Sequence, residues 1–309
     1  MNSILLTGAT GFLGSHLLKG LLRNNYRVII LKRKASNTWR IRDEIGGIKF
    51  YNVDEESLDN IFQNEKVDAV IHTAGYYGRS EDSILNAIES NLTFSVNLVE
   101  HCMKYEVPNF FNTDSFFNAK ENPSTYLLGY TLSKKHFVEY LKAFSLTKRI
   151  KIFNLKLQHL YGPNDNEDKF IPWLIQQIIE KKESIDLSDG EQKRDFIYVE
   201  DVVNAYLTLL EKSLSGAFFE KNFYESDIGT GLLYTVKNMI QVLCEEALKL
   251  NLAKPLLNFG AKPRYTGEVE SSVANIVLLR NNGWTIKNNL KSGMQKTIES
   301  YTNRKEYAN

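Results

Sequence analysis

Close to its first residue the chain reads Leu5-Leu6-Thr7-Gly8-Ala9-Thr10-Gly11-Phe12-Leu13-Gly14. Apolar residues precede the glycines and leucines at helical spacing follow them, which predicts a strand, a turn and a helix. Glycines at this spacing in this setting indicate a dinucleotide site, with a purely structural turn as the alternative. Gly8 would allow a tight turn, Gly11 would let a pyrophosphate approach the backbone, and Gly14 would permit close helix–strand packing. The helix start would offer N–H groups to the phosphates. The residues expected to line this site are Thr7, Gly8, Gly11, Phe12, Leu13 and Gly14.

The composition is that of an ordinary globular protein, and 309 residues suffice for a large core in one or two domains. The 38 basic and 37 acidic residues give a net charge of +1, which argues against a nucleic-acid or membrane-surface partner. Cys102 and Cys244 lie on apolar helical patterns without metal-ligand spacing, so we expect buried free thiols and no metal site. No apolar run would span a membrane, and the first strand begins too early for a signal peptide. The sequence predicts a soluble, cytoplasmic protein.

Five further apolar segments follow the first strand, with helical patterns between them. They lie at residues 26–31, 48–53, 67–75, 110–113 and 151–157. This alternation predicts an α/β fold with a doubly wound parallel sheet of the Rossmann type. We expect residues 1–163 to form the dinucleotide-binding domain, with segments near 195–228 returning to it. Residues 164–309 would form mainly a smaller, interleaved α+β substrate lobe, with the substrate between the two parts.

Three cations, Lys32, Arg33 and Lys34, end the second predicted strand. In dinucleotide folds this strand end meets the adenosine ribose, where an acid selects NAD and a basic group accommodates the 2′-phosphate of NADP. The acid is absent here, so the run favours NADP(H) over NAD(H), with a solvated loop as the structural alternative. Val53-Asp54 ends the third strand, and Asp54 would hydrogen-bond the adenine amine, cap a helix, or do both.

His72-Thr73-Ala74 ends the fourth strand in small residues against which a cofactor would lie. The histidine has no metal partner nearby in the sequence, so a structural role is favoured over a catalytic one. Residues 76–79 follow this turn and would face the sugar side. Asn91 lies inside a predicted helical region at 83–105. Because Asn is a poor helix-interior residue, its amide is expected to bond to backbone or water across the site.

Tyr130 and Lys134 lie four residues apart in a predicted helix at 130–144, and therefore on one face of it. A lysine ammonium beside a phenol favours the phenolate, so we expect the pKa of Tyr130 to fall below its usual value of about 10. The same ammonium would hold the nicotinamide ribose. Tyr301 and Lys305 repeat the spacing. The first pair is distinguished by its position after the fifth strand of the nucleotide-binding domain.

Several motifs occur in a fixed order along the chain. They are Thr7-Gly8-Ala9-Thr10-Gly11-Phe12-Leu13-Gly14, His72-Thr73-Ala74-Gly75, Asn91, Tyr130-Thr131-Leu132-Ser133-Lys134 and Arg194-Asp195-Phe196-Ile197-Tyr198-Val199. Over essentially the whole chain this set resembles the extended short-chain dehydrogenase/reductases of the NAD-dependent epimerase/dehydratase branch, which act on nucleotide sugars. The resemblance implies an oxidoreductase with Thr113 as the catalytic Ser/Thr, Tyr130 as the acid/base and Lys134 as its partner. It also implies that Asp54 binds adenine, and that a homodimer forms through helices such as 83–105 and 130–144.

The segment Asn112-Thr113-Asp114-Ser115 narrows the choice within this branch. In its 4,6-dehydratases the threonine is followed by Asp-Glu, whose paired carboxyls eliminate water. Ser115 replaces that glutamate, which argues against a dehydratase. The chain most resembles the nucleotide-sugar 4-ketoreductases, such as CDP-abequose and CDP-paratose synthases and dTDP-4-keto-6-deoxyglucose reductases, which make deoxysugars for the O-antigen of lipopolysaccharide and other surface polysaccharides. The resemblance implies NADPH-dependent reduction of the C4 ketone of a CDP- or dTDP-linked 4-keto-6-deoxyhexose. Lys156 and His159 depart from the wider branch, where Arg and Asn are common.

The sequence also suggests which side chains meet the substrate. They are Tyr76, Thr113, Asp114, Ser115, His159, Arg194 and Arg264. A guanidinium binds phosphate bidentately, although an ion pair within the protein is an alternative for each arginine. An NAD-dependent 4-epimerase needs the same Thr, Tyr and Lys and is the first alternative function. A non-catalytic NADP-binding sensor or scaffold is the second, although such proteins often lack the Tyr/Lys pair.

Overall fold

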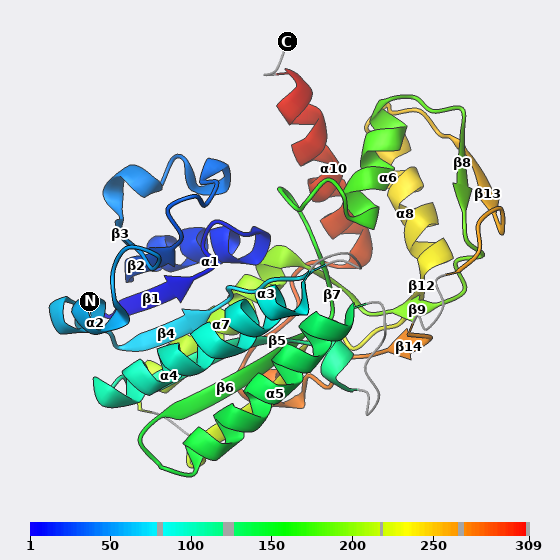
Figure 1. The fold of residues 1–309 in the computed structure, drawn as a ribbon. Helices are drawn as coiled ribbons and strands as arrows, with labels where there is room; N and C mark the ends of the chain where they lie inside the picture. The colour runs from blue at the N-terminus through cyan, green and yellow to red at the C-terminus, as the bar shows by residue number, and fades with distance from the viewer. Residues whose placement is uncertain (79–82, 120–126, 217–218, 265–268, 307–309) are drawn as a thin grey trace. The chain divides into compact units, whose positions relative to one another are not determined.

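The computed structural model describes residues 1–78, 83–119, 127–216, 219–264 and 269–306, and Figure 1 shows the path of the chain. The chain forms two compact units. Unit 1 comprises Met1–Leu157, Val203–Asp227 and Val277–Trp284, and unit 2 comprises Gln158–Val202, Ile228–Ile276 and Thr285–Asn309. Unit 1 therefore includes two segments from later in the chain. The sequence pattern did not predict the second of them, Val277–Trp284.

Unit 1 is built on a seven-stranded sheet in the order β11-β6-β5-β4-β1-β2-β3. Its strands are β1 (Ser3–Thr7), β2 (Arg27–Lys32), β3 (Lys49–Asn52), β4 (Ala69–His72), β5 (Asn109–Ser115), β6 (Lys151–Leu157) and β11 (Phe223–Ile228). β1 to β6 pair in parallel, which confirms the predicted Rossmann-type sheet. The chain leaves the sheet at β3 and re-enters at β4, beside β1, and open α/β sheets bind ligands outside the strand ends at such a switch point.

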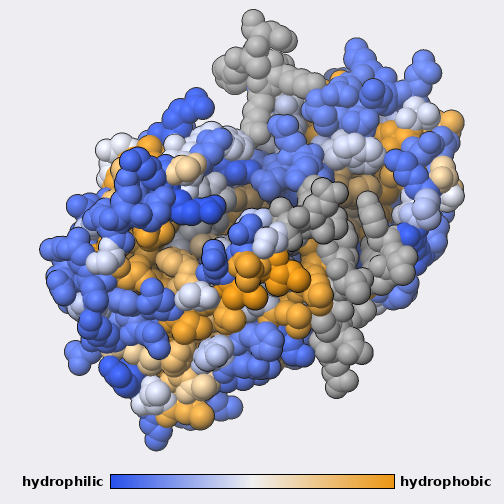
Figure 2. Space-filling model, in the orientation of Figure 1, coloured by the Kyte–Doolittle hydropathy of each residue, from blue (hydrophilic) through white to orange (hydrophobic). Residues whose placement is uncertain are grey.

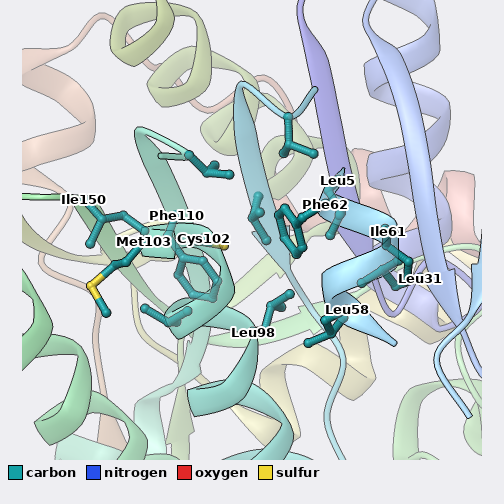
Figure 3. Close-up of a cluster of buried hydrophobic side chains, with 14 of the residues drawn as sticks. Leu5, Leu31, Leu58, Ile61, Phe62, Leu98, Cys102, Met103, Phe110 and Ile150 are labelled. Atoms are coloured by element: carbon teal, nitrogen blue, oxygen red, sulfur yellow. The ribbon is translucent and has the colours of Figure 1, made fainter. Parts of the chain in front are cut away.

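Helices cover both faces of this sheet. Those of unit 1 are α1 (Phe12–Arg23), α2 (Leu58–Asn64), α3 (Ile84–Ile88), α4 (Phe94–Lys104), α5 (Leu128–Ser145), α9 (Val277–Asn281) and most of α7 (Val199–Leu214). Side chains of α2, α4 and α5 pack on the sheet in one buried cluster, part of which is shown in Figure 3. On the other face α1 meets α7 so closely that a Cβ at Gly20 would lie 2.5 Å from Val203.

Both cysteines of the chain are buried, Cys102 in unit 1 and Cys244 in unit 2. Cys102 lies in the cluster of Figure 3 and has no exposed surface, and Cys244 of α8 (Val236–Lys249) is 3% exposed. Both are free thiols, as expected. Burial raises the pKa of each, so neither is an activated nucleophile.

The helical region expected at 83–105 is not one regular helix. α3 passes into a π-helical turn, Glu89–Thr93, before α4 begins. Asn91 sits in this turn and is fully buried. π-helical turns inside α-helices are frequently found at functional sites.

Among its described residues, unit 2 contains three small sheets and three whole helices. Its strands are β7 (His159–Tyr161), β8 (Ser184–Leu187), β9 (Lys193–Arg194), β10 (Phe196–Tyr198), β12 (Tyr234–Thr235), β13 (Leu256–Phe259) and β14 (Ser271–Ser272), and its helices are α6 (Phe170–Ile179), α8 and α10 (Leu290–Glu306). The fully buried Asp195 carboxylate accepts hydrogen bonds from the backbone N–H groups of Thr230, Gly231 and Ala274, at 2.7 to 3.1 Å. This part of the Arg194–Val199 motif therefore holds the unit together. Within the described ranges, no helix combines the length and apolar character needed to cross a membrane.

Candidate active site

The glycine turn between β1 and α1 has the geometry that its spacing predicts. Gly8 has φ +71°, and a Cβ there would lie 2.6 Å from the backbone nitrogen of Ala74. A Cβ at Gly14 would overlap the carbonyl oxygen of Gly8, so the close approach of α1 to the turn requires glycine. Gly11 caps α1 without a side chain, and the first helical turn contains no acidic residue. No acidic side chain in this turn therefore offsets the positive end of the helix dipole.

His72 links the ends of β1 and β4. Its Nδ1 lies 2.8 Å from Thr7 Oγ1 and its Nε2 lies 2.9 Å from Ser95 Oγ on α4. Thr73 Oγ1 donates to the Thr7 carbonyl, and the Ala74 N–H donates to Thr7 Oγ1. Burial lowers the pKa of His72 far below its usual value, so the imidazole is neutral. The side chain has no exposed surface, so it acts structurally, and a contact of residue 72 with a cofactor would have to come from the backbone.

The basic run after β2 is partly engaged by the protein itself. Lys32 Nζ donates to Asn52 Oδ1 at 2.8 Å, and Lys34 Nζ pairs with Glu55 at 2.5 Å. Arg33 is exposed, and within the described residues its guanidinium makes no hydrogen bond or ion pair. Arg33 is therefore the member of the run that is best able to meet a phosphate.

Asp54 and Val53 lie at the end of β3, beside this run. Asp54 accepts the Lys34 backbone N–H with both carboxylate oxygens, at 2.9 and 3.1 Å. The proposed N-cap role of Asp54 is wrong, because Ser57 caps α2 and accepts from the Asn60 N–H. The adenine-binding role remains a prediction.

The structure adds a cation that the sequence did not indicate. Arg40 donates through a guanidinium N–H to the carbonyl oxygen of Thr10 in the glycine turn, at 3.4 Å. Its guanidinium also lies 4.4 Å from the centre of the Trp39 ring. Arg40 lies eight positions beyond β2, and no pattern in that loop places it at the turn.

Thr113 and Lys134 are joined by a hydrogen bond at the carboxyl end of β5. Lys134, on α5, is 3% exposed, and its Nζ donates to the Thr113 carbonyl oxygen at 2.9 Å. Burial lowers the pKa of Lys134 to about 8, against a smaller raising effect of the Asp114 charge. The Thr113 hydroxyl lies 2.7 Å from the phenolic oxygen of Tyr206 on α7, a residue that sequence reasoning missed.

Tyr130 does not have the lowered pKa expected from its spacing to Lys134. Burial raises its pKa, the charges of Tyr77 and Asp114 add to the effect, and a hydrogen bond with the Ser115 hydroxyl offsets it only in part. The Lys134 ammonium bonds to the Thr113 carbonyl and does not contribute to this shift. Tyr130 is thus a neutral phenol, with the Tyr77 ring 4.9 Å away. A neutral phenol can donate a proton.

Asp114 points into the protein and is 3% exposed. Its two oxygens accept from Asn118 Nδ2 at 2.5 Å and Asn154 Nδ2 at 3.0 Å. Burial raises its pKa. The substrate contact expected of Asp114 is therefore not supported.

Lys156, which departs from the wider branch, forms ion pairs with Glu225 and Asp227.

Asn91 fixes the loop that follows β4. Its Oδ1 accepts the Tyr76 N–H at 2.6 Å, while its Nδ2 donates to the Tyr76 carbonyl at 2.9 Å and to Ser133 Oγ at 3.0 Å. The expected interaction of this amide with backbone is confirmed. Arg79, also expected near the sugar, lies outside the described residues.

The substrate residues expected in unit 2 have partners within that unit. Arg194 is 4% exposed and donates to the Lys193 carbonyl. Arg264 pairs with Asp189 at 2.5 Å and with Glu270 at 3.2 Å, which matches its ion-pair alternative. Burial lowers the pKa of His159 to about 3, assisted by the charge of Arg194, so this ring is neutral.

A family model described as the NAD dependent epimerase/dehydratase family matches residues 4–219. The chain belongs to this family. This confirms the family resemblance, the Rossmann-type fold and the expectation of an oxidoreductase-type enzyme. The glycine turn, Asn91, Tyr130 and Lys134 all lie inside the matched region.

Individual proteins agree with this membership. The chain is 32% identical over 297 residues to the CDP-abequose synthase of Salmonella muenchen, covering 96% of both chains. It is also similar to the crystal structure of the Thermotoga maritima UDP-glucose 4-epimerase with UDP-glucose, with 25% identity and a TM-score of 0.82 over 98% of this chain and 99% of that one. The Thermus thermophilus UDP-glucose 4-epimerase in complex with NAD matches the fold, with 23% identity and a TM-score of 0.80 over 97% and 99% of the two chains.

Proposed function

We propose that this protein reduces the C4 ketone of an NDP-4-keto-6-deoxyhexose with NADPH, in the synthesis of a deoxysugar for surface polysaccharide such as O-antigen. The observation that carries the proposal is the pairing of Ser115 with the neutral phenol of Tyr130. A serine occupies the position where dehydratases of the family carry a carboxylate, so this site has a proton donor without the second carboxylate needed for elimination. The similarity to a CDP-abequose synthase over nearly the whole chain supports a deoxysugar substrate linked to CDP or dTDP.

The residues of unit 1 fit a dinucleotide. The glycine turn packs so closely on α1 that there is no space for a Cβ at Gly14, and the first turn of the helix lacks an acidic side chain that would repel a phosphate. Gly75 brings the end of β4 close to Lys134, since a Cβ at Gly75 would lie 3.8 Å from Nζ. The buried ammonium is thus beside the strand end where the nicotinamide ribose would lie.

When bound, a nicotinamide cofactor would supply the hydride to C4, while side chains of the protein act on the C4 oxygen. The neutral Tyr130 phenol donates its proton to the C4 oxygen as the carbonyl π electrons move onto it. The Thr113 hydroxyl donates a hydrogen bond to the same oxygen, and Ser115 holds the phenol in place. Lys134 keeps Thr113 and the ribose in position. The phenolate then regains a proton from solvent, leaving the 4-hydroxy sugar and the oxidised cofactor.

The preference for NADPH rests on two arginines. Arg33 is exposed beside the strand end that meets the ribose, and Arg40 reaches the glycine turn. Guanidinium groups bind phosphate bidentately, so this pair suits a 2′-phosphate. No acid occupies the end of β2, where NAD-specific folds hold the ribose hydroxyls.

The enzyme is further proposed to act as a homodimer. Large apolar side chains are exposed on α3 and the neighbouring α5, and Figure 2 shows an apolar patch over these helices. Ile84 is 54% exposed, Leu85 66% and Leu128 37%. A contiguous patch of this kind marks an interaction surface.

The deciding assay follows NADPH oxidation with CDP- and dTDP-linked 4-keto-6-deoxy sugars, with NMR of the product. Consumption of one NADPH per sugar and a new C4 hydroxyl are expected. Interconversion of UDP-sugar C4 epimers, with tightly bound NAD and no effect of added NADPH, would instead establish the 4-epimerase, which uses the same Thr113, Tyr130 and Lys134. Failure of every sugar nucleotide to react would favour a non-catalytic NADP-binding protein.

A further inference from the structure

A buried phenol holds the hydroxyl of Thr113. Tyr206 Oη lies 2.7 Å from Thr113 Oγ1, and Tyr206 has no exposed surface. Thr113 is the one hydrogen-bond partner of this phenol among the residues that the structure describes. The two residues are 93 positions apart, one on β5 and the other on α7, and both belong to unit 1.

The chemistry of the pair sets the direction of its hydrogen bond. A phenol is a stronger acid than an aliphatic alcohol, and burial raises the pKa of Tyr206 further, so it keeps its proton. A buried O–H needs an acceptor, and the Thr113 oxygen is the acceptor within reach. The phenol therefore donates to Thr113. The Thr113 hydrogen is then directed away from Tyr206.

Thr113 is thereby fixed at two points. Its backbone carbonyl accepts the Lys134 ammonium at 2.9 Å, and its side-chain oxygen accepts the Tyr206 phenol. Thr113 itself is only half-buried, so its remaining O–H is the part of this group that can reach a ligand. A hydroxyl that already accepts one hydrogen bond is also a better donor in the next.

We propose that Tyr206 is a positioning residue, which orients and polarises the Thr113 hydroxyl toward the C4 oxygen of the substrate. This inference rests on the proposed function, because Thr113 must act on that oxygen. Tyr206 itself contacts neither substrate nor cofactor. Its hydroxyl acts only through Thr113.

Tyr206→Phe removes this hydroxyl and keeps the buried ring. We expect kcat to fall roughly tenfold, the value of about one neutral hydrogen bond, with KM and the NADPH dissociation constant unchanged. Thr113→Val should cost more, and adding Tyr206→Phe to it should cost nothing further. Thr113→Ser keeps an acceptor oxygen, so the tenfold effect of Tyr206→Phe should persist in that background. Tyr161→Phe is the matched control, since it removes another buried phenol, bonded to the Leu290 carbonyl in unit 2, and should leave kcat unchanged.

The outcomes separate this inference from the proposed function. An active wild type with an equally active Tyr206→Phe variant overturns the inference alone, as does an equal loss in the Thr113→Val background. Loss of NADPH binding in Tyr206→Phe would assign the phenol to folding and also overturn it. A wild type that is inert with every sugar nucleotide overturns the proposed function, and the inference with it. If the wild type proves to be an epimerase, the same variants are measured in that reaction, where Thr113 faces the same C4 oxygen.

Discussion

The Lys134 ammonium donates a 2.9 Å hydrogen bond to the backbone carbonyl oxygen of Thr113, from a position 3% exposed to solvent. A buried ammonium is unusual and costly, and burial lowers its pKa to about 8. The Lys134 ammonium can therefore lose its proton within the pH range of ordinary buffers. The site combines this titratable cation with a neutral phenol.

Turnover should fall as the pH rises through about 8, because Lys134 then loses the charge that holds the ribose and the Thr113 carbonyl. Stability should change in the opposite sense. The folded pKa lies below the unfolded value, so unfolding takes up a proton between these pH values and the free energy of unfolding rises with pH. The first effect is measured as the pH profile of kcat for the wild type. The second is measured by urea unfolding, as the pH dependence of the difference in the free energy of unfolding between the wild type and Lys134→Met. The exposed Lys142→Met change on the same helix should leave both profiles as in the wild type, and a wild-type kcat that stays flat across pH 8 would contradict the assignment.

Tyr130→Phe should lower kcat by roughly 10²- to 10⁴-fold, the usual range for loss of a proton-transferring group. NADPH affinity should change little, because the proton is needed only in the reaction. Stopped-flow NADPH oxidation and a fluorescence titration measure the two quantities. Tyr140→Phe removes an exposed phenol from the same helix and serves as the control. Full turnover in Tyr130→Phe would show that another residue is the proton donor.

Gly14→Ala should abolish NADPH binding and destabilise the protein by at least about 1–3 kcal/mol, since the new methyl group would overlap the Gly8 carbonyl and force the turn or α1 to shift. Gly46→Ala is the matched control, because nothing lies within 4 Å of a Cβ at Gly46. NADPH titration and urea unfolding of the two variants test this difference. Equal behaviour of the two would show that the turn adapts.

Arg33→Gln and Arg40→Gln should each weaken NADPH binding by roughly 10- to 100-fold, the cost of a hydrogen bond to a charged group, and leave NADH binding nearly unchanged. The comparison of the two cofactors isolates the 2′-phosphate. Arg42→Gln changes an exposed arginine in the same stretch and should alter neither affinity. Parallel losses for NADPH and NADH would place these arginines at the pyrophosphate or assign them to folding.

The parts of the site that the sequence predicts are those set by local pattern. The turn from Gly8 to Gly14 follows from residue size and backbone freedom over one turn, and the parallel strands follow from short apolar segments between helices. Tyr130 and Lys134 were identified from their spacing on one helix. The expected effect of one on the other was wrong, because burial and the charges of Tyr77 and Asp114 raise the pKa of Tyr130, and spacing reveals none of these.

The parts that the sequence does not predict arise from contacts between distant segments. Tyr206 meets Thr113 only because α7 returns to the sheet, and Arg40 meets Thr10 only because of the path of its loop. Asp114, expected at the substrate, turns instead toward Asn118 and Asn154. Each of these outcomes depends on tertiary packing, which leaves no periodic signal in the chain.

The π-helical turn at Glu89–Thr93 contains Asn91, which belongs to the site, and leads into α4, whose side chains pack in the core. The core and the site place different demands on the orientation of these side chains. Side chains of α4 such as Leu98 and Cys102 must keep their register with the sheet, while Asn91 must keep its amide on Tyr76. Each residue advances an α-helix by about 100° around its axis. Deleting Leu92 or Thr93 would therefore keep the core register of α4 and swing Asn91 away from Tyr76. The extra residue of the turn therefore sets the direction of Asn91 independently of the packing of α4 in the core.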